Sequence, residues 1–354
     1  MYEVFNVWES ETWNEYINKM QQADVYFTAE YCQIYENNGD GKAQLFVYTE
    51  GDKCICYPYL LRRIDEQLSN VRTSDEWFDI TSPYGYGGPL TNITDRQERQ
   101  AFFQTFSRVF SDYCQSQHIV SEFIRFHPLI ENHQYYDAAA PEMNRKTVAL
   151  KLENCEEAMM KSLTSKCRNR VRYAMKQGLT VHKEESVHLD CLIDQYMKTM
   201  KKNQADDYYF FSRKFFEDTL QLLEGSVDLF TVKYQDQVIA SAIFLRYGEY
   251  VSYHLTGSDQ QYLHLAPYNL LILTAAMEFG KQGYKYLHLG GGYNGNDDLL
   301  RFKKTFIKND PIDFYIGKKI HNTHIYHRLT QHVDEKEDYF PLYRQPLLKQ
   351  LETV

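Results

Sequence analysis

The sequence has little that points to a membrane or to export. Its longest apolar stretch, around "NLLILTAAMEF", has about half of the roughly 20 residues that a membrane-spanning helix needs. The first residues, "MYEVFNVWES", contain no basic segment followed by an apolar one, which a secretory leader requires. We therefore expect a protein that has no membrane span and works in the cytoplasm.

A disulfide framework is also missing. The seven cysteines are odd in number and scattered along the chain. They are Cys32, Cys54, Cys56, Cys114, Cys155, Cys167 and Cys191. This distribution fits reduced thiols in a reducing compartment.

Positive charge is in short supply overall, since the net charge is −9. That balance argues against broad non-specific nucleic-acid binding, although a local basic groove remains possible within it. Hydrophobic residues make up 43% and charged residues 25%, as in ordinary globular proteins, and 354 residues suit two domains. The aromatic content of 15% is mostly Tyr and Phe, which we expect in β-rich cores and tyrosine-rich surfaces; a stacking groove is the alternative.

Several familiar catalytic motifs are absent. There is no G-K-[ST] of a phosphate-binding loop and no G-x-S-x-G serine. The histidines of "HNTHIYH" recur every third residue, which drifts about 60° off alignment on a helix, and neither carboxylate nor cysteine lies between them. We expect no metal site and no bound cofactor.

The periodicity predicts an α/β fold with mixed sheets, in which one order of elements occurs twice. In the first half we expect a helix at 9–20 that Thr12 could cap, two strands within 43–64, and at 78–90 a strand that ends in a loop. A helix at 96–116 and a strand at 121–129 follow. Periodicity fails around Pro141, so a boundary is expected near residue 145. In the second half we expect a strand at 146–152, helices at 155–179, 189–203 and 212–225, and strands at 227–234, 237–247 and 249–258. An apolar helix from Pro267 to Gly283, a strand at 284–289 and, after a further helix, a strand at 312–317 finish the domain. The last ~35 residues are expected to pack back as helix.

Three glycines between a predicted strand and helix match the spacing of a dinucleotide fingerprint: Gly290, Gly292 and Gly295. Too little chain follows for the βα repeats of a dinucleotide-binding fold. The amides of this loop, at Gly291 and Gly292, remain candidates for holding an anion at the helix start, where Asp297 and Asp298 would compete with it.

A basic stretch, "KSLTSKCRNRVRYAMK", contains no acid. On a helix Arg168, Arg172 and Lys176 form one row, and Lys166 with Arg170 forms a neighbouring one. The pattern is typical of a solvated surface helix. A phosphate-bearing substrate or a tRNA backbone is the functional alternative, because it would turn the repulsion between these charges into attraction.

Two further stretches offer candidate ligand contacts. The loop "TSPYGYGGPL" reads as a tight exposed turn, with Tyr84 and Tyr86 able to face a ligand. After Asn296 a helix would place Lys303 in the middle of an apolar arc. A lysine there must snorkel, pair with a buried anion or receive an anionic ligand.

Taken together, "SKCRNRVRYAMKQGLTV", "YHLTGSDQQYLHLAPYNLLILTAAMEFGKQGYKYLHLGGG" and "DDLLRFKKTF" resemble the Fem-type aminoacyltransferases and their relatives in the GNAT acyltransferase superfamily. The "SPYGYGGP" loop is shared with similar bacterial proteins. The resemblance implies two tandem GNAT-like domains, at 1–145 and 146–318, followed by a helical extension at 319–354. It also implies transfer of an acyl or aminoacyl group to an amine of a cell-envelope precursor or similar phosphate-bearing metabolite.

The resemblance assigns roles to residues that match its motifs. Its "FK" pair matches Phe302 and Lys303, so Lys303 would be the catalytic lysine that stabilises the oxyanion. Arg168, Arg170 and Arg172 match its basic helix and would meet phosphates.

Other binding residues follow from position alone. Tyr253, His254 and Asn269 are candidate lining residues on this ground.

The donor would be aminoacyl-tRNA or acyl-CoA. Acyl-CoA enzymes of this superfamily carry a glycine-containing pyrophosphate loop before the helix that here begins near Pro267, whereas this chain has no glycine between Gln260 and Leu271. That departure favours aminoacyl-tRNA. An acyl-CoA-dependent N-acetyltransferase of polysaccharide or natural-product synthesis is the first alternative, and a non-catalytic module that binds a nucleotide-sugar or RNA is the second. The acceptor would be a small molecule or precursor peptide, and the oligomeric state is left open.

Overall fold

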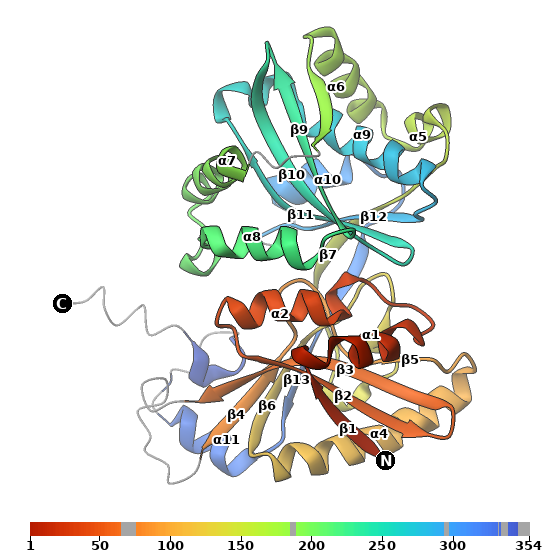
Figure 1. Ribbon diagram of the computed structural model, residues 1–354, viewed down its shortest axis with the longest axis vertical. Coiled ribbons are helices and arrows are strands. Elements are labelled where there is room, and N and C mark those ends of the chain that lie inside the picture. Colours follow the sequence, from red (N-terminus) through yellow and green to blue (C-terminus); the bar gives the residue numbers. More distant parts are fainter. Residues whose placement is uncertain (65–75, 185–188, 294–296, 332, 334–338, 346–354) are drawn as a thin grey trace, which may run out of the picture. The chain divides into compact units, whose positions relative to one another are not determined.

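The computed structural model divides the chain into two units (Figure 1). The described residues are 1–64, 76–184, 189–293, 297–331, 333 and 339–345. One unit comprises Met1–Asn144 and Phe314–Val354, and the other comprises Arg145–Asp313.

The first unit contains a mixed sheet in the order β1-β2-β3-β4-β6-β13. Its strands are β1 (Tyr2–Asn6), β2 (Lys42–Glu50), β3 (Lys53–Ile64), β4 (Trp77–Thr81), the short β5 (Leu90–Thr91) beside β3, β6 (Ile119–Arg125) and β13 (Ile312–Ile320). Its helices are α1 (Ser10–Asn18), α2 (Ala29–Asn37), α4 (Arg96–Ser116) and α11 (Thr323–Thr330). Neighbouring strands are antiparallel except for β4 and β6, which run parallel.

The second unit repeats this plan with the order β7-β12-β11-β10-β9-β8. Its strands are β7 (Glu142–Lys151), β8 (Thr180–Glu184), β9 (Val227–Tyr234), β10 (Gln237–Tyr247), β11 (Tyr250–Ser258) and β12 (Tyr286–Gly291). Its helices are α5 (Glu156–Ser162), α6 (Ser165–Lys176), α7 (Leu189–Lys202), α8 (Arg213–Leu222), α9 (Pro267–Lys281) and α10 (Asp298–Lys304). Here β11 and β12 are the parallel pair.

The repeated order predicted from the sequence is confirmed. In each unit an antiparallel hairpin leads into a third strand, a long helix crosses over, and the next strand lies parallel to the third. The crossover helices are α4 and α9. Because parallel neighbours need a crossover connection, this order requires one helix on the sheet face in each unit.

The two crossover helices fill the two cores. The inward face of α4 is aromatic, and its rings pack edge-on or tilted against aromatic residues of β2 and β3, as the composition predicted. The α9 helix is apolar on most of its surface and packs among strands of the second unit. It lies so close to the chain at Glu153 that a side chain at Gly280 would collide with the Glu153 carbonyl.

The domain ends differ from those predicted. The strand at 312–317 was expected to finish the second domain, but β13 pairs with β6 from Ile316 to Ile320. The C-terminal residues therefore belong to the first unit, where α11 packs on β6 through Ile325 and Leu329. Of the predicted helical extension, residues 346–354 lie outside the described part of the chain.

Other differences are local. The helix predicted across 155–179 is broken at Leu163 into α5 and α6, because Thr164 caps the second helix. Thr12, the predicted cap of the first helix, lies inside α1 instead. The strands β1 and β8 and the helix α2 were not predicted; all three are short.

Candidate active site

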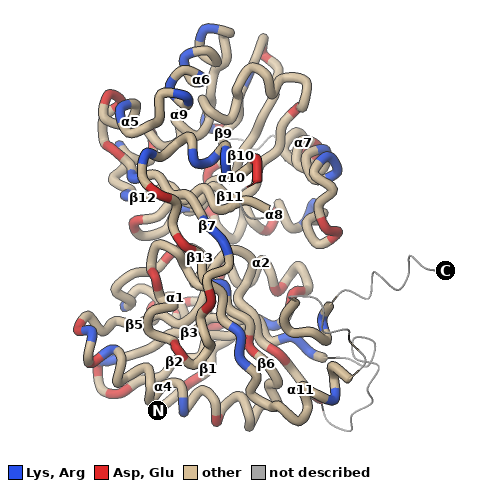
Figure 2. Tube along the Cα trace, turned by 180° about the vertical axis from the view of Figure 1, so that it is seen from behind, with Lys and Arg blue, Asp and Glu red and all other residues tan. Residues whose placement is uncertain are grey.

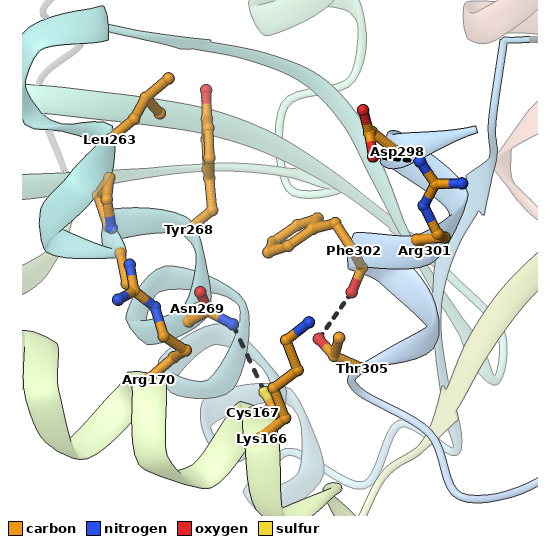
Figure 3. A pocket seen from close by; sticks show the side chains of 12 residues that line it. Lys166, Cys167, Arg170, Leu263, Tyr268, Asn269, Asp298, Arg301, Phe302 and Thr305 are labelled. Atoms are coloured by element: carbon orange, nitrogen blue, oxygen red, sulfur yellow. Dashed lines mark hydrogen bonds and ion pairs between the residues drawn. The ribbon is translucent and has the colours of Figure 1, made fainter.

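A cavity of about 430 Å³ lies in the second unit between α6, the start of α9, and α10 (Figure 3). It is lined by Lys166, Cys167, Arg170, Leu263, Ala266, Pro267, Tyr268, Asn269, Asp298, Arg301, Phe302 and Thr305. Its volume is within the range of small-molecule and cofactor sites. The lining combines apolar side chains with a few polar groups, which is the usual composition of such sites.

The position of α6 follows from Thr164. Its hydroxyl accepts a hydrogen bond from the Cys167 amide at 3.2 Å and donates one to the Thr305 carbonyl at 2.5 Å. The same side chain thus caps the start of α6 and ties it to the end of α10. Cys167 and Val171 form the buried face of α6, so its basic residues, coloured blue along that helix in Figure 2, lie on its other faces.

The two basic rows of α6 have different surroundings. Lys166 and Arg170 line the cavity, and the Arg170 guanidinium also donates to the His264 carbonyl at 2.9 Å. Figure 3 shows Lys166 extending toward Thr305, with Arg170 on the α9 side. Within the described chain Lys166 has no hydrogen-bond or ion-pair partner, so its charge is available to a ligand.

Arg168 and Arg172 do not line this cavity. The Arg168 guanidinium donates to the Leu163 carbonyl at 2.5 Å and to the Ser165 hydroxyl at 3.2 Å, so it closes the start of its own helix. Arg172 is exposed on the outer face of α6. Of the three predicted arginines, Arg170 alone contributes to the cavity, and Lys166 joins it because it lies one turn earlier in the same row.

The start of α9 forms the opposite wall. Ala266 has φ 62° and ψ 45°, a left-handed conformation, and Pro267 opens the helix. Asn269, predicted as a lining residue, does line the cavity; its side-chain amide donates to the Cys167 sulfur at 3.6 Å. Tyr268 and Phe302 also line the cavity and were not predicted, since nothing in an apolar helix marks which aromatic side chain faces a space.

Lys303 is buried, as its place in an apolar arc predicted, with 8% of its surface exposed. It lies one residue beyond Phe302 on α10 and does not line the cavity. Its ammonium donates a hydrogen bond to the Gly291 carbonyl at 2.7 Å. The described residues give it no ion pair, so the buried-ion-pair alternative is not realised among them.

Burial lowers the pKa of Lys303 to about 8. The carboxylate of Asp297 opposes this change, since a nearby negative charge favours the ammonium form. Most Lys303 side chains are therefore charged at pH 7, and a substantial fraction is neutral one unit higher.

Lys303 contacts β12 just beyond the point where the parallel ladder ends. The described β11–β12 pairs run from Tyr250–Tyr286 to Ser252–His288, after which β12 pairs only with β7. The Gly291 carbonyl that accepts from Lys303 lies three residues past the last pair. Beyond the last β11–β12 pair, the carbonyl group of a substrate can accept hydrogen bonds beside the buried Lys303 ammonium.

Tyr253 and His254 follow the last β11 pair but cannot line one site together, because successive strand residues point to opposite faces. Tyr253 packs against the core below α9, and its hydroxyl donates to Thr256 at 3.0 Å. Burial lowers the pKa of His254 to about 4, so its imidazole is neutral at pH 7. Neither residue lines the α6–α9–α10 cavity.

In the described part of the glycine loop, the Asp297 carboxylate lies beside the backbone of Gly292 and Tyr293. Gly291 is the last residue of β12. The amide of Tyr293, two residues later, donates a hydrogen bond to the Asp297 carboxylate at 2.5 Å. A side chain at Gly292 would collide with that carboxylate. The competition expected from Asp297 is therefore realised; Gly295 lies outside the described residues.

The predicted aromatic loop belongs to the first unit and is mostly buried, so its description as exposed was wrong. The Tyr86 ring packs between Tyr26 and His127, with centroids 5.2 and 5.4 Å away. Tyr84 is half-buried, and its carbonyl accepts from the Tyr31 hydroxyl at 2.7 Å. Tyr86 is thus buried among aromatic side chains of the first unit.

Two features bear on cofactors and membranes. In the part of the chain that is described, no group of His, Cys, Asp and Glu side chains is arranged to hold a metal ion. His321 instead bonds to the buried Glu122 carboxylate at 2.9 Å. None of the helices in the described ranges combines the length and apolar character that crossing a bilayer requires.

Comparisons with known proteins agree with this architecture. Residues 165–304 match the family model "Acetyltransferase (GNAT) domain", a range that contains α6, α9, α10 and the cavity between them. No curated protein sequence matches the chain.

Three solved structures share the fold across most of the chain. FemX has a TM-score of 0.68 at 12% identity, over 92% of this chain and 98% of its own. A C-terminal domain assigned to a lysylphosphatidylglycerol synthetase of Agrobacterium fabrum has a TM-score of 0.52 at 12% identity, over 92% and 95%. L-PGS from Bacillus licheniformis has 0.51 at 10% identity, over 87% and 90%. Residues 165–304 of the second unit are accordingly similar to a GNAT domain, and the chain as a whole has the same fold as FemX.

Proposed function

We propose that the chain transfers an aminoacyl group from a phosphate-bearing donor to an amine of a cell-envelope precursor, and that the donor's phosphates bind at the start of α9. The observation that carries this proposal is the cavity of about 430 Å³ with Lys166 and Arg170 on its wall. A helix start favours anions through its free amides and its dipole. Two cations opposite that helix start make phosphate the ligand chemistry that fits best.

The proposed reaction is an acyl transfer. The neutral amine of the acceptor attacks the donor's carbonyl carbon and a C–N bond forms. The bond from that carbon to the donor's oxygen then breaks, and the proton lost by the attacking nitrogen ends on the leaving oxygen. Lys303 would stabilise the oxyanion that forms on the way. Of its three N–H donors, one is used by the Gly291 carbonyl. Loss of such a preorganised donor typically lowers kcat by about 10²–10³-fold.

Aminoacyl-tRNA is the donor proposed first because the cations of α6 extend beyond the cavity. Arg172 and Lys176 are exposed on the same helix and lie outside the lining. A polynucleotide backbone can contact both rows at once, whereas a compact donor needs only the inner one. The FemX fold is consistent with this choice and with a precursor acceptor.

Acyl-CoA is the second candidate donor, and the backbone conformation of Ala266 favours it. The absence of a glycine before α9 argued against a close pyrophosphate turn. However, Ala266 adopts the left-handed conformation that glycine would take most easily. The turn into α9 is therefore made without glycine, and the objection from the sequence loses its force.

Thermal unfolding with each ligand tests the proposal. Acetyl-CoA, a pool of charged tRNA and a UDP-muramoyl pentapeptide are added in turn; a ligand at 100 times its Kd adds about 2.7 kcal/mol of stability. Lys166→Ala should abolish the shift given by the donor. Lys281→Ala is the matched control, since it removes the same charge from an exposed position in the last turn of α9, outside the cavity and outside α6.

The pattern of losses identifies the donor. If the donor is acyl-CoA, only Lys166→Ala weakens binding. If it is aminoacyl-tRNA, Arg172→Ala and Lys176→Ala weaken it too, and the effect grows at low salt. A donor shift that survives Lys166→Ala, or no shift with any donor, contradicts the proposed site.

A further inference from the structure

Asp297 holds the glycine loop and α10 together through both of its carboxylate oxygens. Oδ1 accepts from the Leu300 amide at 2.8 Å and thereby caps α10. Oδ2 accepts from the Tyr293 amide at 2.5 Å. One side chain thus fixes the start of the helix that carries Lys303 relative to the end of the strand that Lys303 contacts.

The loop is constrained from its other side by cations. The Arg145 guanidinium donates to the carbonyls of Gly292 and Tyr293 at 3.2 and 3.3 Å. Lys303 donates to the carbonyl of Gly291. Three consecutive carbonyls therefore face positive charge, while the Tyr293 amide faces the negative charge of Asp297.

Gly292 is required by this arrangement. It has no left-handed backbone that would demand glycine, but a Cβ there would collide with the carboxylate of Asp297. Because Gly292 has no side chain, the Asp297 carboxylate has room beside it. The position of the Asp297 carboxylate consequently depends on glycine at position 292.

Of the charged groups on the elements around Lys303, Asp297 is the one that stabilises its ammonium form. On α10, Arg301 pairs with Asp298 at 2.5 Å, and Lys304 is exposed. On β7, Lys146 pairs with Asp313 at 2.5 Å. His288 of β12, which forms the last ladder pair with Ser252, is buried. Asp297 is the carboxylate whose charge favours the protonated form of Lys303.

From these contacts we infer that Asp297 is a positioning residue for the transfer site: it fixes the start of α10, which carries Lys303, against the end of β12, and the absence of a side chain at Gly292 gives its carboxylate room. The inference rests on the proposed function for its consequence in catalysis. Its structural content, a coupling between Asp297, Gly292 and Lys303, stands independently of any substrate.

The first test measures Lys303 itself and needs no substrate. Trace acylation of the intact protein across pH, read by mass spectrometry, gives the pKa of individual lysines. Asp297→Asn keeps a capping residue and removes the charge, so the measured pKa of Lys303 should fall below its wild-type value. Asp95→Asn, at the cap of α4 in the first unit, is the matched control and should leave it unchanged. An unchanged value in Asp297→Asn would overturn the inference.

A second test uses Gly292 and alters no charged residue. Gly292→Ala should displace the carboxylate and lower the pKa of Lys303 in the same direction as Asp297→Asn. In an Asp297→Ala background the added methyl meets no carboxylate, so Gly292→Ala should have little further effect. Equal effects of Gly292→Ala in both backgrounds would show that the two residues act separately and would refute the coupling between Gly292 and Asp297.

The catalytic consequence is read from the transfer reaction. Asp297→Asn should lower kcat by up to about 10²-fold with little change in KM for the donor, and shift the pH–rate profile, because misplacement of a catalytic group affects the reacting state. A shifted Lys303 pKa in a protein that transfers nothing, even as wild type, would refute the proposed function and leave the positioning role intact. A loss confined to KM, with no change in the pH profile, would refute the positioning role.

Discussion

Replacement of Lys303 by Met should make folding stability less dependent on pH above neutrality. Lys303 is buried with only a carbonyl as its hydrogen-bond acceptor, and burial lowers its pKa from 10.5 to about 8. In the unfolded chain the ammonium returns to water. Methionine fills nearly the same volume without a charge, so the variant retains the packing of α10 and loses only the titration.

The sign of the effect follows from proton binding. Between pH 8 and pH 10.5 the unfolded state holds more protons at this position than the folded state, so wild-type stability rises with pH across that window. Below pH 8 the desolvation cost of the charged lysine is present in full. The whole difference corresponds to about 3 kcal/mol, and about 2 kcal/mol of it should appear between pH 7 and pH 9.5.

Urea denaturation of both proteins at pH 7, 8, 9 and 9.5 measures this difference. Buried tyrosines with raised pKa, such as Tyr253, titrate in both proteins and cancel in the subtraction. Lys304→Met, at the exposed neighbouring position, should leave the slope unchanged. A wild-type minus Lys303→Met difference that stays constant over this range would refute the reasoning, since it would mean that Lys303 is paired with an anion or solvated.

Three further substitutions test how the site is built, each by urea denaturation. Ala266→Gly should raise stability by up to about 1 kcal/mol, because alanine is strained at φ 62°; a loss would show that the turn is not left-handed. Thr164→Ala should lower it by about 1–2 kcal/mol through loss of the cap and of the bond to Thr305, and Thr164→Ser should restore it. Gly280→Ala should lower it by about 1–3 kcal/mol, because the methyl has no room beside the Glu153 carbonyl; a neutral result would mean that α9 is packed less closely.

Long periodic segments were predictable because their burial is written into the order of their residues. The helix α4 and the strands β9 and β10 match their predicted ranges, and α9 begins at its predicted proline. The break between α5 and α6 was missed, although Thr164 carried the signal of a helix cap. The short elements β1 and β8 are held mainly by their partner strands, so their own residues gave little sign of them.

The candidate site was predictable only in part. Arg170 and Asn269 line the cavity, as predicted, because a basic row and a helix start mark their positions in sequence. Tyr86 was misplaced, because glycines and prolines around a tyrosine cannot show whether the loop folds over a core. Tyr268 and Phe302 were missed, because which face of an apolar helix meets a cavity depends on the neighbouring helix.

By itself the sequence determined the repeated order of strands and helices, the basic character of α6 and the anomalous lysine in an apolar arc. These are local properties, set by the period of apolar residues and by capping and turn chemistry. The tertiary structure decided to which unit β13 belongs, and that Lys166 lines the cavity whereas Arg168 does not. It also decided that the Asp297 carboxylate accepts a hydrogen bond from the Tyr293 amide of the glycine loop. Each of these depends on contacts between residues far apart in the chain, where packing and hydrogen bonding select one arrangement among several that the local sequence allows.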